Sequence, residues 1–394
     1  MAVKRPKTLG RRSELEQAGS VRGTLVWWLA GVLSLPLTGT ARAESYTATA
    51  AFNGDPPATF ITQPQPNKVA AAATAQLRCA EHQRARDPNQ GFCELVKLNG
   101  QALTTTSDIR RRLPTEPHPL FLWRYETGGA IAYLAGSVHI LKPGLYPLPE
   151  QFEAAYAVAD TIVLEVDLSQ FTPQVLQTKT LQYGMLESGK TLRSVMSPEL
   201  YDELGMTTQA YGLPLSQLQQ LKPAFVTQQL TLLALMSIGY DPNQGVESYF
   251  IQRRGERGIL ELESIDFQLD LLMNQPLATQ IAMVRDTLRQ MPAFEALTTE
   301  LIVAWLSGDD AAFQAAFEAQ TGDSPELLEF MRQLLEERNA RMADRIAELL
   351  EGTGTFFVLA GSAHFVGKNS IIEYLDERGL RGHRLHSDTP VGAR

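Results

Sequence analysis

Two nearly identical hexapeptides that lie far apart along the chain constrain its fold more than any other feature. Residues 134–139 read LAGSVH and residues 359–364 read LAGSAH. Each copy completes an apolar run that is typical of a buried strand, at 130–134 and 355–359. In an open α/β sheet, the carboxyl ends of neighbouring parallel strands converge on one crevice. We therefore expect the two terminal histidines to lie close together at that edge.

These histidines, His139 and His364, are candidate metal ligands. Two imidazoles and a carboxylate form a recurrent ligand set for a divalent metal at hydrolytic or redox sites. A single histidine would more often be an ordinary hydrogen-bonded residue, but the repeated context favours a shared site. Gly136 and Gly361 precede their histidines by three residues. Glycine there would let the backbone turn sharply and approach its neighbour closely.

Acidic residues that end apolar strands supply the candidate carboxylate. Glu165 and Asp167 follow the apolar run at 161–164, and Glu263 ends a short predicted strand at 258–263. A charge at the end of a central strand needs a partner if it is buried, so Glu165 is the first choice. A salt bridge or a helix cap is the alternative role for each acid.

The order of the predicted elements indicates an α/β or α+β fold. Apolar runs at 120–124 and 130–134, separated by a glycine pair, predict a hairpin. The second run, a helix at 149–160 and a strand at 161–167 predict a βαβ unit. The chain then becomes mostly helical.

A second βα unit closes the chain, with the strand at 355–359, a helix at 370–378 and a strand at 382–386. One long helix is predicted at 324–350, with Glu and Arg spacings that are typical of a solvated face. The fold class is therefore a central, mostly parallel or mixed sheet. Its N- and C-terminal βα units carry the duplicated G-x-x-H motifs, and a large helical insertion separates them.

The N-terminal segment has the order of a secretory signal. A basic stretch precedes an apolar run at 23–37, which leads to Ala-Arg-Ala at 41–43. Pro36 breaks the apolar run, which is shorter than the ~20 residues that cross a bilayer. We predict a signal peptide at 1–43 with cleavage after Ala43, no stable membrane span, and a periplasmic or secreted protein.

Two cysteines, Cys79 and Cys93, are the only ones in the chain. In an exported protein such a pair favours one disulfide that closes a small loop; the alternative is two free or buried thiols. Composition predicts a flexible leader at 44–75, rich in Ala, Thr, Pro, Asn and Gln. A small disulfide lobe at 76–114 and a main domain at 115–388 follow.

Charge and missing motifs disfavour several classes of function. The net charge is −9, with no long basic run beyond the N-terminus, so a nucleic-acid partner is not expected. No H-E-x-x-H sequence is present, and the glycines at 361–368 lack the spacing of a phosphate loop. Ser137 and Ser362 stand beside the histidines but outside a G-x-S-x-G sequence, which disfavours a serine nucleophile.

Several short sequences around these motifs resemble the TraB/GumN group, which includes the Tiki metalloproteases. The resemblance covers 120–385 and begins with the paired G-x-x-H motifs. The further matching segments are Lys142-Pro143, Tyr146-Pro-Leu-Pro149, Val163-Leu-Glu165-Val-Asp167, Leu262-Glu263 with Gln268, Glu337-Arg338-Asn339, and Gly367.

The resemblance implies an α/β domain related to the Tiki and ChaN-like folds, with a divalent-metal site. His139 and His364 would ligate the metal, and Glu165 would be a ligand or the general base. The residues that would support the site or position the substrate are Glu263, Arg338 and Asn339.

The leading functional hypothesis is an exported, metal-dependent hydrolase that acts on a peptide or a small molecule with manganese, cobalt or zinc. In such a site the metal lowers the pKa of bound water towards ~7. One alternative is a non-catalytic metal- or haem-binding protein of ChaN-like fold. Another is an accessory factor in envelope or exopolysaccharide biology, with the long charged helix as its interaction face.

Overall fold

The computed structural model describes residues 44–85, 91–322 and 324–391. The predicted signal peptide lies outside these residues. Among the helices that are described, none has both the length and the apolar character that a membrane span requires.

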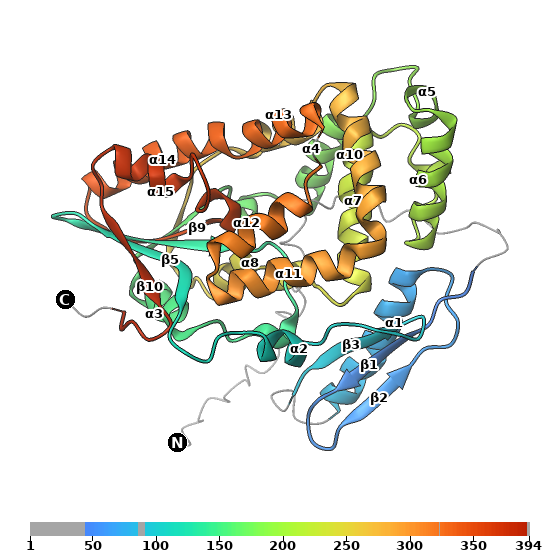
Figure 1. Ribbon diagram of the computed structural model, residues 1–394, viewed down its shortest axis with the longest axis horizontal. Coiled ribbons are helices and arrows are strands. Elements are labelled where there is room, and N and C mark those ends of the chain that lie inside the picture. Colours follow the sequence, from blue (N-terminus) through green and yellow to red (C-terminus); the bar gives the residue numbers. More distant parts are fainter. Residues whose placement is uncertain (1–43, 86–90, 323, 392–394) are drawn as a thin grey trace, which may run out of the picture.

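A mixed sheet of six strands carries both hexapeptides, in the order β10-β5-β6-β9-β7-β8 (Figure 1). β6, β9, β7 and β8 run parallel, whereas β5 pairs with β6 and β10 with β5 in the antiparallel sense. The predicted hairpin and the predicted α/β class are therefore confirmed. The strands are β5 (Pro119–Glu126), β6 (Ala130–Ser137), β7 (Thr161–Leu164), β8 (Gly258–Glu261), β9 (Gly354–Gly361) and β10 (Gly382–His386).

The late strand β9 inserts between β6 and β7, which are joined through α3 (Glu150–Val158). The predicted strand-helix-strand unit is thus present, but its two strands are not neighbours. β6 and β9 pair along their whole length, with Gly136 opposite Ala360 and Ser137 opposite Gly361. The two hexapeptides therefore leave adjacent parallel strands with an offset of one residue.

Helices cover the sheet on both sides (Figure 1), with α14 (Glu336–Glu351) and α15 (Ile371–Glu377) above it and α3 below in that view. α14 packs against β6. On the α3 side, the rings of Tyr156 and Phe357 meet edge to face at 5.6 Å between centroids. Aromatic contacts of this kind add to the apolar burial that holds a helix on a sheet.

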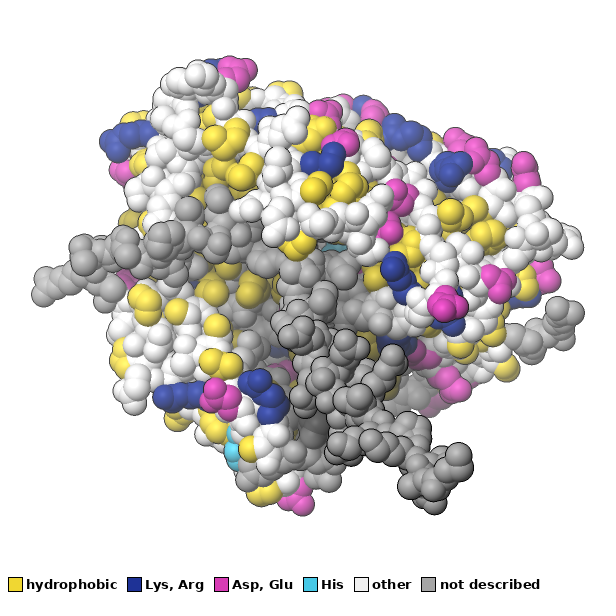
Figure 2. Space-filling view, turned by 180° about the vertical axis from the view of Figure 1, so that it is seen from behind, with side chains coloured by type: hydrophobic (Ala, Val, Ile, Leu, Met, Phe, Trp, Pro, Cys, Tyr) yellow, Lys and Arg dark blue, Asp and Glu magenta, His cyan; other side chains and the backbone are white. Residues whose placement is uncertain are grey.

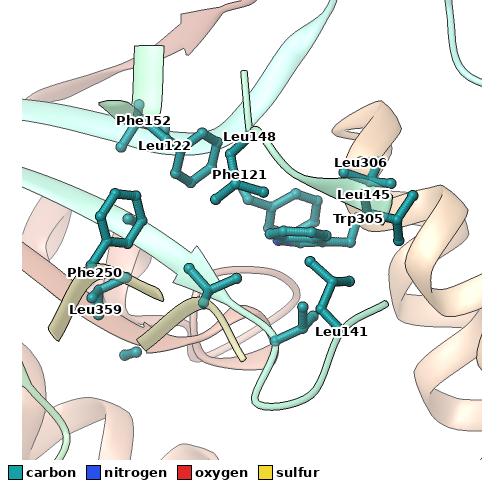
Figure 3. Close-up of a cluster of buried hydrophobic side chains, with 14 of the residues drawn as sticks. Phe121, Leu122, Leu141, Leu145, Leu148, Phe152, Phe250, Trp305, Leu306 and Leu359 are labelled. Atoms are coloured by element: carbon teal, nitrogen blue, oxygen red, sulfur yellow. The ribbon is translucent and has the colours of Figure 1, made fainter. Parts of the chain in front are cut away.

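A buried apolar cluster contains Trp305, whose indole contacts the first hexapeptide (Figure 3). The Trp305 indole N–H donates to the Gly136 carbonyl at 3.0 Å, which ties the motif to α11 (Phe294–Ser307). Buried Trp needs such a partner for its polar atom. The labelled members of the cluster are Phe121, Leu122, Leu141, Leu145, Leu148, Phe152, Phe250, Trp305, Leu306 and Leu359.

The predicted helical insertion is present and contains a second apolar core. Its helices often begin with a hydroxyl cap followed by proline, as at Ser197-Pro198 and Ser324-Pro325. The helices are α4 (Pro173–Gly184), α5 (Leu192–Val195), α6 (Pro198–Ala210), α7 (Pro223–Ser237), α8 (Val246–Ile251), α9 (Ile265–Met273), α10 (Leu277–Gln290), α11 (Phe294–Ser307), α12 (Asp310–Ala319) and α13 (Pro325–Leu334), and α14 is the last.

The prediction of a single long helix at 324–350 is wrong. The structure has two helices, α13 and α14, separated at Leu335, where φ is −111° and ψ is −71°. The Glu and Arg spacing continues across the break, so the pattern could not mark it. It also predicted a solvated face, yet Arg338 and Asn339 on α14 are buried.

The prediction of a flexible leader at 44–75 is also wrong, because this segment is folded. It contributes two strands and the start of a helix to a lobe whose four-stranded sheet has the order β2-β1-β3-β4. Ala48, Ala50 and Phe52 alternate inward along β1. Alanine is a weak strand signal, so composition concealed this strand. The elements are β1 (Ala48–Phe52), β2 (Ala58–Ile61), α1 (Lys68–Arg84), β3 (Cys93–Leu98), β4 (Gln101–Ala102) and α2 (Thr106–Arg111).

This N-terminal lobe contacts the segment that follows His139. The buried Lys142 amine donates to the Thr104 carbonyl, and Arg110 donates to the Gly144 carbonyl at 3.1 Å. A Cβ on Gly144 would lie 2.3 Å from the Phe92 ring, so glycine permits this close contact. The lobe and the main sheet are therefore joined beside the first histidine.

The described surface on one face of the molecule mixes charges of both signs. On the face shown in Figure 2, acidic and basic side chains lie interspersed among apolar ones rather than gathered into a single patch. Such a distribution agrees with the modest net charge of −9.

The predicted Cys79–Cys93 disulfide is present and ties α1 to β3 across a sequence separation of 14. Replacing both cysteines by alanine should lower the free energy of unfolding of the lobe by about 2–4 kcal/mol, because the unfolded loop regains its freedom. Urea unfolding of the two proteins measures this difference. Reductant should weaken the native protein and leave the double variant unchanged; equal sensitivity of both would contradict the assignment.

Candidate functional site

The carboxyl ends of three adjacent parallel strands bring the predicted site residues together. His139 follows β6, His364 ends the short turn after β9, and Glu165 follows β7. A Cβ built on Gly361 would lie 3.4 Å from Glu165 Oε1, 3.5 Å from His139 Nε2 and 3.6 Å from His364 Cδ2. The three side chains therefore surround one small space, which exists because residue 361 is glycine.

Neither motif glycine has an unusual backbone conformation. Each instead leaves space that a Cβ would occupy. Gly361 has φ −54° and ψ 136°, a conformation open to any residue, so the sharp turn expected from sequence is not what requires glycine. A Cβ on Gly136 would approach Ser362 Oγ to 2.9 Å. Gly136 therefore permits the close approach that the sequence predicts, whereas a Cβ at Gly361 would make ordinary contacts and occupy the space between the three side chains.

His364 is buried and held in one tautomer. The Asn339 amide N–H₂ donates to the Asn369 carbonyl at 2.8 Å, so its oxygen faces His364 Nδ1 at 2.6 Å. That oxygen can only accept, so Nδ1 carries the hydrogen and Nε2 keeps its lone pair. Nε2 lies 3.9 Å from Glu165 Oε1. Burial lowers the pKa of His364 to about 4, which keeps the ring neutral at pH 7.

His139 has a different partner and a different exposure. Its Nδ1 lies 2.8 Å from Glu247 Oε1, and its side chain is 57% exposed, against 5% for His364. The Glu247 carboxylate raises the pKa of His139 above its usual value. Sequence reasoning missed Glu247; its only signal was an acid in the first turn of a mostly apolar helix, α8.

Glu165 is enclosed by hydrogen-bond donors on both oxygens. Oε1 accepts from the Gly361 backbone N–H at 2.6 Å, and Oε2 accepts from Arg338 at 2.6 Å and from Gln268 at 3.2 Å. Burial alone would raise the pKa of Glu165, but His364 and Arg338 outweigh it and lower the pKa to about 2. The carboxylate is therefore ionised at neutral pH.

Glu263 faces Arg338 rather than the histidines. It accepts from Arg338 Nε at 2.9 Å and from Gln268 at 3.2 Å, and its side chain is 3% exposed. Arg338 also donates to the Leu334 carbonyl at 3.1 Å. The guanidinium is thus committed to two carboxylates and a carbonyl, which suits a residue that holds Glu165 in place.

Three weaker candidates have other roles. Asp167 accepts from the backbone N–H of Ser169 at 2.9 Å, so it caps a turn. Ser137 donates its hydroxyl to Glu247, and Ser362 donates to the Ser137 carbonyl at 2.9 Å. Both serines are buried with their hydroxyls committed, which argues against a nucleophilic role.

The donor chemistry around Gly361 fits a divalent metal. Two imidazole Nε2 atoms and one carboxylate oxygen are a common ligand set, and each ring uses Nδ1 for a second residue, as metal-bound histidines do. Within 44–85, 91–322 and 324–391, however, no group of three or more His, Cys, Asp or Glu side chains is already arranged to hold a metal ion. The residues fit by type and direction, and ligand distances would require the side chains to close in.

Replacing Arg338 by methionine should lower the free energy of unfolding by about 3–5 kcal/mol, because two buried carboxylates lose their shared partner. Urea unfolding gives the value. Arg345→Met is the matched control on the same helix: its ion pair with Glu348 is exposed, so its loss should cost about 0–1 kcal/mol. Similar losses in both variants would contradict the network.

Lowering the pH should weaken the metal-free protein through His364. Its folded pKa of about 4 lies below the usual ~6.5, so between these values the unfolded chain binds more protons. Stability should fall by up to about 3 kcal/mol as the pH drops through this window. NMR titration of the ring protons measures the pKa of His364; a midpoint near the usual ~6.5 would contradict the assignment.

Comparisons with known proteins place this site in a family. The model of the TraB/PrgY/gumN family matches residues 121–383. An uncharacterized protein of Treponema pallidum (strain Nichols) is 25% identical over 270 residues, covering 66% of this chain and 80% of that protein. Metalloprotease TIKI1 of Danio rerio is 25% identical over 358 residues, covering 76% of this chain and 70% of that protein. No solved structure matches significantly. Since the family match spans both hexapeptides and every residue around them, the chain belongs to the TraB/PrgY/gumN family.

Proposed function

We propose that this chain is a metal-dependent hydrolase that cleaves peptide bonds. The observation that carries the proposal is the convergence of His139 Nε2, His364 and Glu165 Oε1 around Gly361. The similarity to a protein named metalloprotease in Danio rerio supports the same reaction class. This similarity is the reason why a peptide is preferred to another small molecule as the substrate.

The proposed ligands are His139 and His364 through Nε2 and Glu165 through Oε1. Glu165 Oε1 and His139 Nε2 face the space around Gly361, and His364 Nε2 lies 3.9 Å from Glu165 Oε1. A divalent metal bound there supplies a Lewis acid that polarises a carbonyl and lowers the pKa of water towards ~7. Manganese, cobalt and zinc all accept this ligand set.

The remaining polar residues hold these three groups in place. Asn339 keeps the His364 lone pair on Nε2, and the Gly361 N–H fixes Glu165 Oε1. Arg338 bonds to Glu165, to Glu263 and to the Leu334 carbonyl, so its hydrogen bonds are made within the protein. We therefore assign Arg338 and Glu263 to positioning. Glu165 is the carboxylate beside the reacting position, and we assign it as a ligand.

The disulfide supports a location where thiols are oxidised. Cys79 and Cys93 are bonded, and such bonds persist mainly outside the reducing cytosol. We propose a periplasmic or secreted enzyme.

The test is metal content and activity of the purified protein and its variants. Elemental analysis of natively purified protein should show about one bound divalent ion per chain. Protein stripped with chelator should cleave a mixed peptide library only after addition of manganese, cobalt or zinc. His139→Ala and His364→Ala should each lower metal affinity and activity by more than about 100-fold, since loss of a ligand exceeds the 10–100-fold effect of an outer-shell residue.

His383→Ala is the matched control, because His383 is exposed on β10 and distant in sequence from both motifs. It should behave as the native protein. Undiminished metal content and cleavage in both motif variants would reject the proposal. An intense Soret absorption band in the native protein would instead favour the haem-binding alternative.

A further inference from the structure

We infer that Glu247 is a positioning residue that orients His139 so that Nε2 faces the proposed metal position. This inference rests on the proposed function and extends it to a residue outside the ligand set. It depends on three contacts between α8 and the first hexapeptide.

The first contact is between backbones at the start of α8. The Val246 N–H donates to the Val138 carbonyl at 3.0 Å. A Cβ on Gly245 would lie 2.2 Å from the His139 carbonyl oxygen, a distance that no side chain tolerates. Glycine at 245 therefore lets the helix start lie directly against the backbone of His139.

The second and third contacts meet at one carboxylate oxygen. Glu247 Oε1 lies 2.8 Å from His139 Nδ1 and also accepts the Ser137 hydroxyl. Ser137 is buried, so the carboxylate is fixed from two directions. With Nδ1 held by Glu247, the opposite nitrogen, Nε2, points to the space at Gly361.

The other histidine is held in the same manner, which argues that the arrangement serves the site rather than local packing. His364 Nδ1 is hydrogen-bonded to Asn339 on α14, and the other edge of the ring faces Glu165. Each histidine thus has one partner from the helical insertion. The partner of His139 is a carboxylate, which increases the donor strength of Nε2 more than a neutral amide does.

Cobalt binding to the stripped full-length protein tests the inference without relying on turnover. Glu247→Ala should weaken Co²⁺ affinity by about 10–100-fold and alter the visible cobalt bands, because the ring is free to rotate. Glu247→Gln keeps an accepting oxygen of the same reach without the charge, so it should recover part of the affinity. Circular dichroism shows whether Glu247→Ala is folded. If that variant folds poorly, Glu247→Gln still tests the inference.

Glu153→Gln is the matched control. Glu153 also anchors α8, accepting from the Tyr249 hydroxyl at 2.6 Å and pairing with Arg253, yet neither of those contacts involves a histidine. Its replacement should leave cobalt binding unchanged. Equal loss in Glu153→Gln and Glu247→Gln would overturn the inference, because Glu247 would then only attach α8.

The inference and the proposed function fail in different ways. Native affinity in Glu247→Ala together with weak binding in His139→Ala and His364→Ala would overturn the role of Glu247 alone. Native affinity in both histidine variants would overturn the proposed metal site and this inference with it.

Discussion

Parallel pairing of β6 with β9 is the contact on which the site depends. It joins a strand near the start of the main sheet to one near the end of the chain, with Ser137 opposite Gly361. Both strands therefore end at the same edge, and the histidine that closes each hexapeptide lies beside the same space. β7 pairs with β9 on its other side and delivers Glu165 beside them. The three groups come from three strands, so their separation is fixed by strand spacing and not by flexible loops.

A second constraint is the buried charge that follows from this convergence. Glu165 and Glu263 end adjacent strands, and two carboxylates at one edge would repel each other in a desolvated place. Arg338 lies between them and bonds to both, and Gln268 donates to both. Removing water strengthens these pairings only because every partner is present. The network therefore has value as a unit, and α14 must arrive in one orientation for it to form.

The helical insertion supplies most of the side chains that hold the strand-end residues in position. Glu247 comes from α8, Gln268 from α9, and Arg338 and Asn339 from α14. The sheet thus presents the candidate ligands, and the insertion orients them. The N-terminal lobe adds a third support, because Lys142 and Gly144 lie just beyond His139 and contact that lobe directly. A substitution far from the histidines in sequence can consequently alter their geometry.

The sequence by itself determined the strands that carry the hexapeptides, the hairpin, the helical insertion and the cysteine pair, because these depend on local periodicity and short motifs. It also predicted that His139, His364 and Glu165 are candidate site residues, since polar residues that end apolar strands stand out. Only the tertiary structure decided that β9 lies between β6 and β7, that the charged helix breaks at Leu335, and that Glu247 partners His139. All three features arise from packing between distant segments, which leaves no periodic pattern in the sequence. The helix breaks without proline or glycine, and the hydrogen bond between Glu247 and His139 spans 108 residues.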